Sequence, residues 1–542
     1  MGSKSILTIN RIRMNKEILI TLILLLGYNA GFSQNAEVWG NWRSWGDQRD
    51  GTYKNPIIPS DYSDIDCIRV GDDYYAISST FQFSPGMIIL HSKDLVNWRI
   101  CGHGIADITQ ISLELNWDKM NRYGKGVWAG TIRYYNEKFY IYFGTPDEGY
   151  FMTSAVTPEG PWEPLSPILQ ESGWDDCSVL WDEEGNGCFV GTHFADGYKT
   201  YLFKLSSDGK TIDRKSAVLV NSGSGREANK LIKVNGWYYL IFSEYKHDKG
   251  RYVIAKRSKR LMGPYNEEKQ LALPSKEFME PNQGGIVEGK DGNWYFFTHH
   301  GTGDWAGRIS SLLPITWVDN WPVIGTVLPD NIGSMKWTSE MPHLENNEFY
   351  IKRSDDFDSD SLSEQWEWNY QPRKDMYSLT EKKGWLRLKA FLPLKENELL
   401  YAGNTLTQRS FRTYHNEVTV KMDISEMVDG QKCGLCHFSK SYSYLGIKQD
   451  AGVRRIEYYK NGESKEGDII DALSIWFRSE WGLEGKSVYS YSIDGENYKP
   501  FGGSYQLSWG NYRGDRIGLY CFNNKDEKGY VDIDYFHYRI EK

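Results

Sequence analysis

Five stretches of the chain repeat one pattern of polar and hydrophobic positions, in which a polar turn precedes an aromatic, strand-like run. The runs are GDDYYAISST, NEKFYIYFGT, EEGNGCFVGTHF, NGWYYLIFSE and DGNWYFFTHH, whose strands begin at Tyr74, Phe139, Cys188, Tyr238 and Trp294. A spacing near about 50 residues with several strands per repeat is typical of β-propeller blades. Helical periodicity is scarce, so the fold class is all-β. The pattern predicts a five-bladed β-propeller over residues 55–335.

A second alternating pattern begins after the propeller. The segment DDFDSDSLSEQW starts at Asp355 and opens a new run of short strands. It predicts a separate β-sandwich over residues 355–542, with residues 336–354 as the linker. Two domains also agree with a length of 542 residues, which exceeds one ordinary core. The aromatic share of 15% suits pleated, half-buried surfaces.

The longest apolar run lies near the N-terminus, at Ile18–Leu26. It is too short to span a membrane but has the length of a secretory signal core, and Gly31 and Ser33 form a small-x-small cleavage site. We therefore expect a signal peptide over residues 1–33, with Met14 as an alternative start, followed by a lead over residues 34–54. The mature protein is expected to be secreted or periplasmic, without membrane insertion.

Charge and cysteine content narrow the function only slightly. A net charge of −9 argues against nucleic acid as a partner. Seven cysteines spread over the chain do not make a disulfide framework. Cys433 and Cys436 form a single C-x-x-C pair without a second pair, so we interpret them as strand residues rather than zinc ligands.

The candidate chemistry lies upstream of the repeated strands. Ten to twelve residues before each strand start lies one position of a common register: Asp64, Trp128, Asp176, Glu227 and Gln283. The first strand of a propeller blade lines the central channel, so these positions should form a ring at one channel mouth, with three carboxylates. Asp66 shares the strand face of Asp64, because side chains alternate with period two. Asp61 falls outside the register and is expected to be a turn residue.

Several of these segments resemble glycoside hydrolase family 43, which contains β-xylosidases and α-L-arabinofuranosidases. The resemblance rests on NPIIPSDYSDIDCIRVGDDYYAISST, GVWAGTIRYYNEKFYIYF, GWDDCSVLWDEEG and REANKLIKVNGWYYLIFSE, with Gly130 where the family has proline. The segments WLRLKA, NTLTQRS and GYVDIDYFHY resemble the family's concanavalin-like, jelly-roll β-sandwich. By this resemblance Asp64 is the general base, Glu227 the general acid and Asp176 the third carboxylate, in an inverting mechanism.

Other residues are candidates for substrate contact. Phe81, Phe83, Trp128 and Trp305 are suited to stacking on a sugar, although propeller packing alone also explains aromatic residues there. Gln283 completes the ring. Arg308 is expected to contact substrate hydroxyls or a carboxylate, with a structural ion pair as the alternative. His299 and His300 lack a third ligand, so no metal site is predicted; the reaction requires no cofactor, and a structural calcium ion is compatible with the chain.

These features predict a secreted glycosidase that removes terminal pentoses from oligosaccharides or polysaccharides of the xylan or arabinan type. A β-xylosidase is favoured and an α-L-arabinofuranosidase is the close alternative, because both sugars are pentoses with similar hydroxyl groups. A non-catalytic carbohydrate-binding propeller is the alternative of another class, which loss of one ring carboxylate would have favoured. Phosphorolysis would need a basic phosphate cluster, and only Arg226 and Arg308 lie near the ring.

Overall fold

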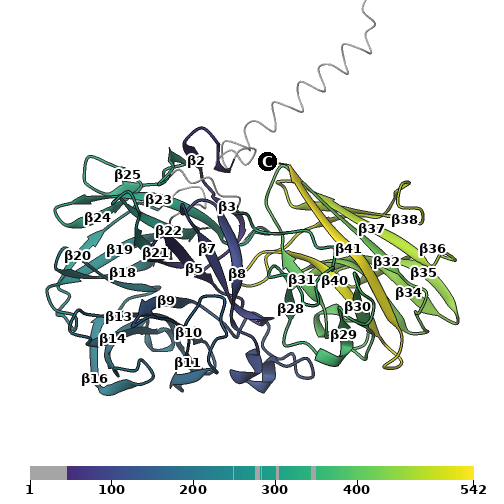
Figure 1. Ribbon diagram of the computed structural model, residues 1–542, viewed down its shortest axis with the longest axis horizontal. Coiled ribbons are helices and arrows are strands. Elements are labelled where there is room, and N and C mark those ends of the chain that lie inside the picture. The colour runs from purple at the N-terminus through teal and green to yellow at the C-terminus, as the bar shows by residue number, and fades with distance from the viewer. Residues whose placement is uncertain are drawn as a thin grey trace, which may run out of the picture.

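The computed structural model describes residues 45–541 except 248–249, 275–280, 282, 301–303 and 344–348. Two bodies of β-structure lie side by side, the propeller at the left and the sandwich at the right of Figure 1. The predicted signal peptide, Met14 and most of the lead lie outside the described residues. No helix within the described ranges has the length and apolar character needed to cross a bilayer.

The first three blades are four-stranded antiparallel sheets. Blade 1 contains β4 (Asp66–Val70), β5 (Asp73–Ser78), β7 (Gly86–Ser92) and β8 (Trp98–Ile105). Blade 2 contains β9 (Gly130–Tyr135), β10 (Lys138–Thr145), β11 (Gly149–Ala155) and β12 (Ser166–Leu169). Blade 3 contains β13 (Trp174–Trp181), β14 (Gly187–His193), β15 (Lys199–Leu205) and β16 (Ile212–Asn221).

The last two blades complete the ring. Blade 4 contains β17 (Glu227–Val234), β18 (Trp237–Lys246), β19 (Gly250–Ser258) and β20 (Glu267–Gln270). Blade 5 contains β21 (Gly284–Glu288), β22 (Trp294–His300), β23 (Ile309–Val318) and β24 (Trp321–Ile324). The N-terminal β3 (Ile58–Asp61) pairs with β23 and so ties the start of the propeller to its last blade.

The inner strands β4, β9, β13, β17 and β21 each contact the next one around the ring, and β21 contacts β4. They therefore surround the channel, as predicted for the first strand of each blade. Apolar side chains such as Ile132, Phe143 and Phe151 fill the space between blades, where both faces of a sheet are covered. This explains why the aromatic strands are apolar on both faces rather than strictly alternating.

The second body is a β-sandwich of two antiparallel sheets. One sheet has the strand order β36 (Glu463–Ile469), β35 (Val453–Lys460), β34 (Tyr442–Asp450), β33 (Gln431–Phe438), β40 (Arg516–Asn523), β31 (Leu406–Arg409), β28 (Glu367–Asn369) and β6 (Phe83–Ser84). The other has the order β29 (Tyr377–Ser378), β30 (Leu386–Lys389), β41 (Tyr530–Glu541), β32 (His415–Asp423), β37 (Ser474–Trp481), β38 (Lys486–Ser492) and β39 (Lys499–Gln506).

The sandwich core follows the alternation expected of half-buried strands. In β32 every second side chain, including Val418, Val420 and Met422, is fully buried, and the intervening residues face outward. The all-β prediction of a propeller followed by a sandwich is confirmed. Cys433 and Cys436 both lie in β33, and all seven cysteines are free and buried.

Short elements complete the chain. The strand β27 (Thr338–Glu340) lies in the predicted linker and pairs with β2 (Thr52–Lys54), which also pairs with β1 (Gly46–Asp47). A small hairpin joins β25 (Thr326–Val327) and β26 (Gly333–Ser334). Single 3₁₀ turns are η1 (Ile108–Gln110), η2 (Leu113–Leu115), η3 (Phe194–Asp196), η4 (Lys374–Met376) and η5 (Leu399–Tyr401).

The two domains share backbone pairing as well as side-chain contacts. β6 belongs to the first blade's segment of the chain, yet it pairs with β28 and so forms the edge strand of a sandwich sheet. The buried Arg409 of the sandwich donates hydrogen bonds to the carbonyl oxygens of Asp61 (2.6 Å) and Ser79 (3.1 Å) in the propeller. The sandwich is therefore attached to the propeller at the end of β3 and just after β5, on either side of Asp64 in the chain.

Candidate active site

The five predicted register positions all lie at the start of an inner strand. Asp64 precedes β4, Trp128 precedes β9, Asp176 lies near the start of β13, Glu227 begins β17 and Gln283 precedes β21. In β13 and β17 the pairing with the next strand shifts register at the carboxylate, between Asp175 and Ser178 in β13 and directly after Glu227 in β17. Asp176 therefore has no paired residue opposite it. The equivalent starts of neighbouring inner strands bring the carboxylates to one end of the channel.

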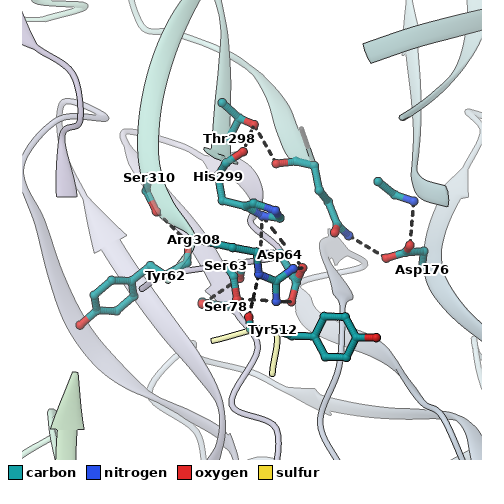
Figure 2. Close-up of polar contacts among 12 residues, drawn as sticks. Tyr62, Ser63, Asp64, Ser78, Asp176, Thr298, His299, Arg308, Ser310 and Tyr512 are labelled. Atoms are coloured by element: carbon teal, nitrogen blue, oxygen red, sulfur yellow. Dashed lines mark hydrogen bonds and ion pairs between the residues drawn. The ribbon is translucent and has the colours of Figure 1, made fainter. Parts of the chain in front are cut away.

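Asp64 is held in a strained and highly polar position. Its backbone has a φ of 59°, in the left-handed region that non-glycine residues seldom adopt. Arg308 donates two hydrogen bonds to its carboxylate, Nη1 to Oδ1 at 2.7 Å and Nη2 to Oδ2 at 3.1 Å. Figure 2 shows Arg308 and His299 beside this carboxylate. Burial, the largest influence, disfavours the charged form, but the bidentate guanidinium and the other polar neighbours of the carboxylate together outweigh it and lower the pKa of Asp64.

Asp176 links the third, fourth and fifth blades. Its Oδ2 accepts the backbone N–H of Ala228 at 2.8 Å, and its Oδ1 accepts the Gln283 amide at 2.9 Å. The φ of Asp176 is 51°, again in the left-handed region. Burial raises the pKa of Asp176, and the negative charge of Asp64 raises it further. The Gln283 amide is therefore bound to Asp176. A contact between Gln283 and the substrate stays a prediction.

Glu227 also has an arginine partner, but its pKa moves in the direction opposite to that of Asp64. Burial raises the pKa of Glu227 to about 7; Arg251 acts against this rise, whereas Asp176 and Asp64 add to it. Arg251 forms an ion pair with the Oε1 of Glu227 at 2.8 Å. The same guanidinium donates to Ser243 Oγ at 2.9 Å and to the Gly225 carbonyl at 3.1 Å, which fixes its position on β19.

Asp61 and Asp66, which flank Asp64 in the sequence, lie at different positions from it in the structure. Asp66 lies inside the channel, where its Oδ2 accepts hydrogen bonds from Arg133 (2.6 Å) and Thr131 (2.5 Å). The Oδ2 of Asp66 is thus held by the channel wall. The expectation that Asp61 is a turn residue is wrong: it lies in β3, and its buried carboxylate accepts the backbone N–H of Arg308 at 2.8 Å.

The predicted aromatic contacts divide into two groups. Trp128 is half-buried, and its ring lies 5.6 Å from that of the exposed Tyr512, which comes from the sandwich. Phe81 is buried beneath Arg308, with 5.8 Å between its ring centre and the guanidinium carbon. Trp128 borders the site around Asp64, and its contact with a sugar stays a prediction, whereas the burial of Phe81 argues against stacking on a sugar.

The prediction for Phe83 is wrong, because its side chain is fully buried in the domain interface. It packs between the guanidinium groups of Arg513 and Arg516, at 4.3 and 4.0 Å from its ring centre. Trp305 is buried against the sandwich as well, where its ring lies above Gly485. Packing between the two domains therefore covers the ring faces of Phe83 and Trp305, on which a sugar would have to stack.

Of the two histidines, the structure describes the side chain of His299. The Nδ1 of His299 accepts the backbone N–H of Asp64 at 2.7 Å, so this nitrogen is unavailable to a metal. The side chain of His300 lies outside the described residues. Within the described part of the chain, one group has metal-ligand spacing, His415, Glu417 and Glu480 on the sandwich. Glu417 already faces Arg478 and Arg539, at 3.6 and 3.8 Å.

Two residues of the site were missed by sequence reasoning. Arg251 lies in a segment, KGRYVIAKRS, in which basic residues are common and no position is distinguished. Tyr512 belongs to the loop GNYRGD, whose glycines indicate a turn but not its destination. Its backbone carbonyl accepts the Nε of Arg308 at 2.8 Å. Only the folded chain brings either residue to the carboxylates.

Comparison with known proteins agrees with this geometry. The family model "Glycosyl hydrolases family 43" matches residues 53–322, and "Beta xylosidase C-terminal Concanavalin A-like domain" matches residues 354–539. A β-xylosidase of Formosa agariphila is 32% identical, with 91% of both chains covered. A non-reducing end α-L-arabinofuranosidase of Bacteroides ovatus is 29% identical over 62% of this chain and 65% of its own.

Among solved structures, the GH43 protein BlXynB of Bacillus licheniformis superposes with a TM-score of 0.78 at 25% identity. The match covers 91% of this chain and 100% of that one. The propeller and the sandwich therefore superpose on that structure in one match, with the same arrangement of the two domains. The chain belongs to glycoside hydrolase family 43 and is a glycosidase with the concanavalin-like C-terminal domain of that family.

Proposed function

We propose that this glycosidase is an inverting β-xylosidase that releases terminal xylose from xylan-derived oligosaccharides. The observation that carries the proposal is that two carboxyl groups at one channel mouth have pKa values that move in opposite directions. Arg308 lowers the pKa of Asp64, while burial raises that of Glu227 to about 7. Two carboxyl groups whose pKa values are driven apart are suited to act as base and acid at the same pH.

In this proposal Asp64 is the general base. Its carboxylate is ionised at neutral pH, and it removes a proton from the water that attacks the anomeric carbon. The oxygen of that water forms the new bond to carbon as the bond to the leaving oxygen breaks. Inverting enzymes place the two carboxyl groups about 6.5–9.5 Å apart to leave room for this water.

Glu227 is the general acid and donates its proton to the leaving oxygen. After one turnover Glu227 is a carboxylate and Asp64 carries the proton from water, so exchange with solvent restores both groups. Arg251, at 2.8 Å from Glu227, stabilises the carboxylate that forms on proton donation. Asp176 disfavours ionisation before the reaction and orients the acid through the N–H of Ala228.

No cofactor is needed, because the two carboxyl groups supply both proton transfers. The preference for xylose is supported by the Formosa agariphila relative, named a β-xylosidase, which matches the chain over 91% of its length. The Bacteroides ovatus relative supports the alternative, an α-L-arabinofuranosidase. The proposal includes export to the periplasm or the medium, on the basis of the apolar run Ile18–Leu26.

The test uses nitrophenyl β-xyloside and nitrophenyl α-L-arabinofuranoside side by side at equal concentration. We expect a higher kcat/KM on the xyloside, and proton NMR of nitrophenyl β-xyloside hydrolysis, in which the glycone is the only xylose released, should show α-xylose as the first anomer. Preference for the arabinofuranoside would select the alternative substrate. Initial release of β-xylose would exclude inversion, and inactivity on both glycosides with sugar binding intact would exclude the enzyme as proposed.

A further inference from the structure

The carboxylate of Asp61 connects the guanidinium-bearing segment of the propeller to a loop of the sandwich. Its Oδ1 accepts the backbone N–H of Arg308 at 2.8 Å, and its Oδ2 accepts the backbone N–H of Gly514 at 2.9 Å. Each oxygen thus serves one domain. Because Asp61 is 7% exposed, water competes little for these two hydrogen bonds.

Two glycines allow the backbones to approach this carboxylate. A Cβ on Gly307 would lie 2.5 Å from the Cγ of Asp61, and a Cβ on Gly514 would lie 2.7 Å from the backbone nitrogen of Gly307. Gly307 also has a φ of 74°, which favours glycine. The three residues therefore form a junction that admits no additional atom, and a displacement of the sandwich loop displaces the chain next to Arg308.

The sandwich also holds the side chain of Arg308. Its Nε donates to the carbonyl oxygen of Tyr512 at 2.8 Å, while Nη1 and Nη2 donate to Asp64. A guanidinium is planar and rigid, so fixing Nε fixes the direction of the other two nitrogens. Figure 2 shows Tyr512 on the side of Arg308 opposite to His299.

We propose that Asp61 is a positioning residue through which the sandwich loop Tyr512–Gly514 sets the geometry of Arg308 against Asp64. The inference rests on the proposed function, in which Asp64 is the general base. It gives the sandwich a role in the chemical step that is separate from shaping the substrate pocket. Asp61 itself touches neither of the two proton-transferring carboxyl groups in the described contacts.

The charged and titratable groups facing Asp64 decide how the proposal is tested. These are the guanidinium of Arg308, the imidazole of His299 and the carboxyl groups of Asp175, Asp176 and Glu227. If Arg308 loses its position, Asp64 loses its main stabilising charge and its pKa rises. Loss of the Asp61 charge acting only through space would instead lower the pKa of Asp64, because a negative neighbour disfavours ionisation. A rise in the pKa of Asp64 therefore indicates that Arg308 has been displaced, and a fall indicates that the charge of Asp61 acts only through space.

The test is the pH dependence of kcat/KM for Asp61→Asn on the glycoside that the wild type cleaves best. Asparagine has nearly the same shape, but its NH2 group must face one of the two N–H donors, so the junction cannot close. We expect the acidic limb, which reports the base in the free enzyme, to move up by about one pH unit, with a roughly ten-fold loss of activity below it. Gly514→Ala, made from the sandwich side, should move the limb in the same direction.

Ser84→Ala is the matched control, because it removes an interdomain hydrogen bond to Gln371 (2.8 Å) that does not involve Arg308. It should lower Tm and leave both limbs in place. An acidic limb that stays or moves down in folded Asp61→Asn and Gly514→Ala would overturn the proposal. Wild-type activity that survives in Asp64→Asn would instead overturn the assignment of the base, so the two failures are distinguishable.

Discussion

The Oδ2 of Asp176 accepts a hydrogen bond of 2.8 Å from the backbone N–H of Ala228, the residue that directly follows Glu227. Ala228 has a φ of 68°, so the chain turns sharply at this point and the hydrogen bond stabilises the turn. Asp176 therefore acts on Glu227 in two ways: its charge disfavours a second carboxylate, and its hydrogen bond fixes the direction of the strand that carries the acid.

Asp176→Asn should separate these two effects. The amide oxygen still accepts the N–H of Ala228, and the Gln283 amide, unlike a backbone N–H, can turn to accept from the new NH2 group. The negative charge is lost, so the pKa of Glu227 falls below about 7. The basic limb of kcat/KM, which reports loss of the protonated acid, should move to lower pH while kcat below it changes little. Asp176→Ala should add a loss of kcat. An unchanged basic limb in Asp176→Asn would show that its charge does not act on the acid.

Arg251→Met should move the same limb in the opposite direction. The guanidinium favours the ionised form of Glu227, so its removal raises the pKa of that group and extends activity to higher pH. Arg251→Lys, which keeps the charge, is the control and should give a smaller change. A shift to lower pH in Arg251→Met would contradict the ion pair as the cause.

Asp64→Asn should retain the fold and lose nearly all turnover. The amide keeps an acceptor for Arg308 but cannot take a proton from water, so kcat should fall at least about 100-fold. Circular dichroism and sugar binding check the fold. Asp66→Asn is the comparison: its carboxylate is bound by Arg133 and Thr131, so we expect a lower Tm rather than a specific loss of kcat. Near-normal turnover in Asp64→Asn would place the base elsewhere.

Glu227→Ala should discriminate between leaving groups. Dinitrophenyl glycosides depart without protonation, so their kcat/KM should change little, whereas xylobiose hydrolysis should fall at least about 100-fold. Asp64→Ala should depress both substrates equally, because water activation is needed in either case. Equal losses on both substrates in Glu227→Ala would show that this glutamate is not the proton donor.

Glu367→Gln should destabilise the protein without changing the pH limbs. Glu367 is 1% exposed and pairs with Arg409, at 3.2 Å, and with Arg516. Removing it leaves two buried guanidinium groups without their carboxylate, which costs about 3–5 kcal/mol in the free energy of unfolding. Denaturant unfolding measures the loss. Asp196→Asn, which breaks the exposed pair with Lys199, is the control and should show no measurable change.

Repetition along the chain is the reason that the architecture and three carboxylates could be predicted. Asp64, Asp176 and Glu227 occupy one register position in the first, third and fourth repeats, and a propeller brings equal positions of its repeats to one end of the channel. The turn-and-strand pattern marks each blade locally, because polar turns and aromatic strands are formed by residues close in sequence. Family resemblance then supplied the role expected of each carboxylate.

The contacts that set the charge of those carboxylates have no such local signature. Arg251 reaches Glu227 from the third strand of its blade, and Arg308 reaches Asp64 across 244 residues. Phe83 carries the same aromatic pattern as Phe81, yet β6 places it in the sandwich sheet, where it is buried. Which strand β6 pairs with depends on how the sandwich packs against the propeller, and the residues of β6 alone do not determine it.

The sequence by itself determined the two-domain all-β fold, the five repeats and the three acids, because each depends on spacing within one segment. The tertiary structure alone decided in which direction the pKa of each acid moves and which groups hold it in place. Asp61 and Gly514 are separated by 453 positions, and their hydrogen bond exists only because the sandwich docks on the propeller at β3. Such a contact depends on the packing of two folded surfaces, which no periodicity along the chain records.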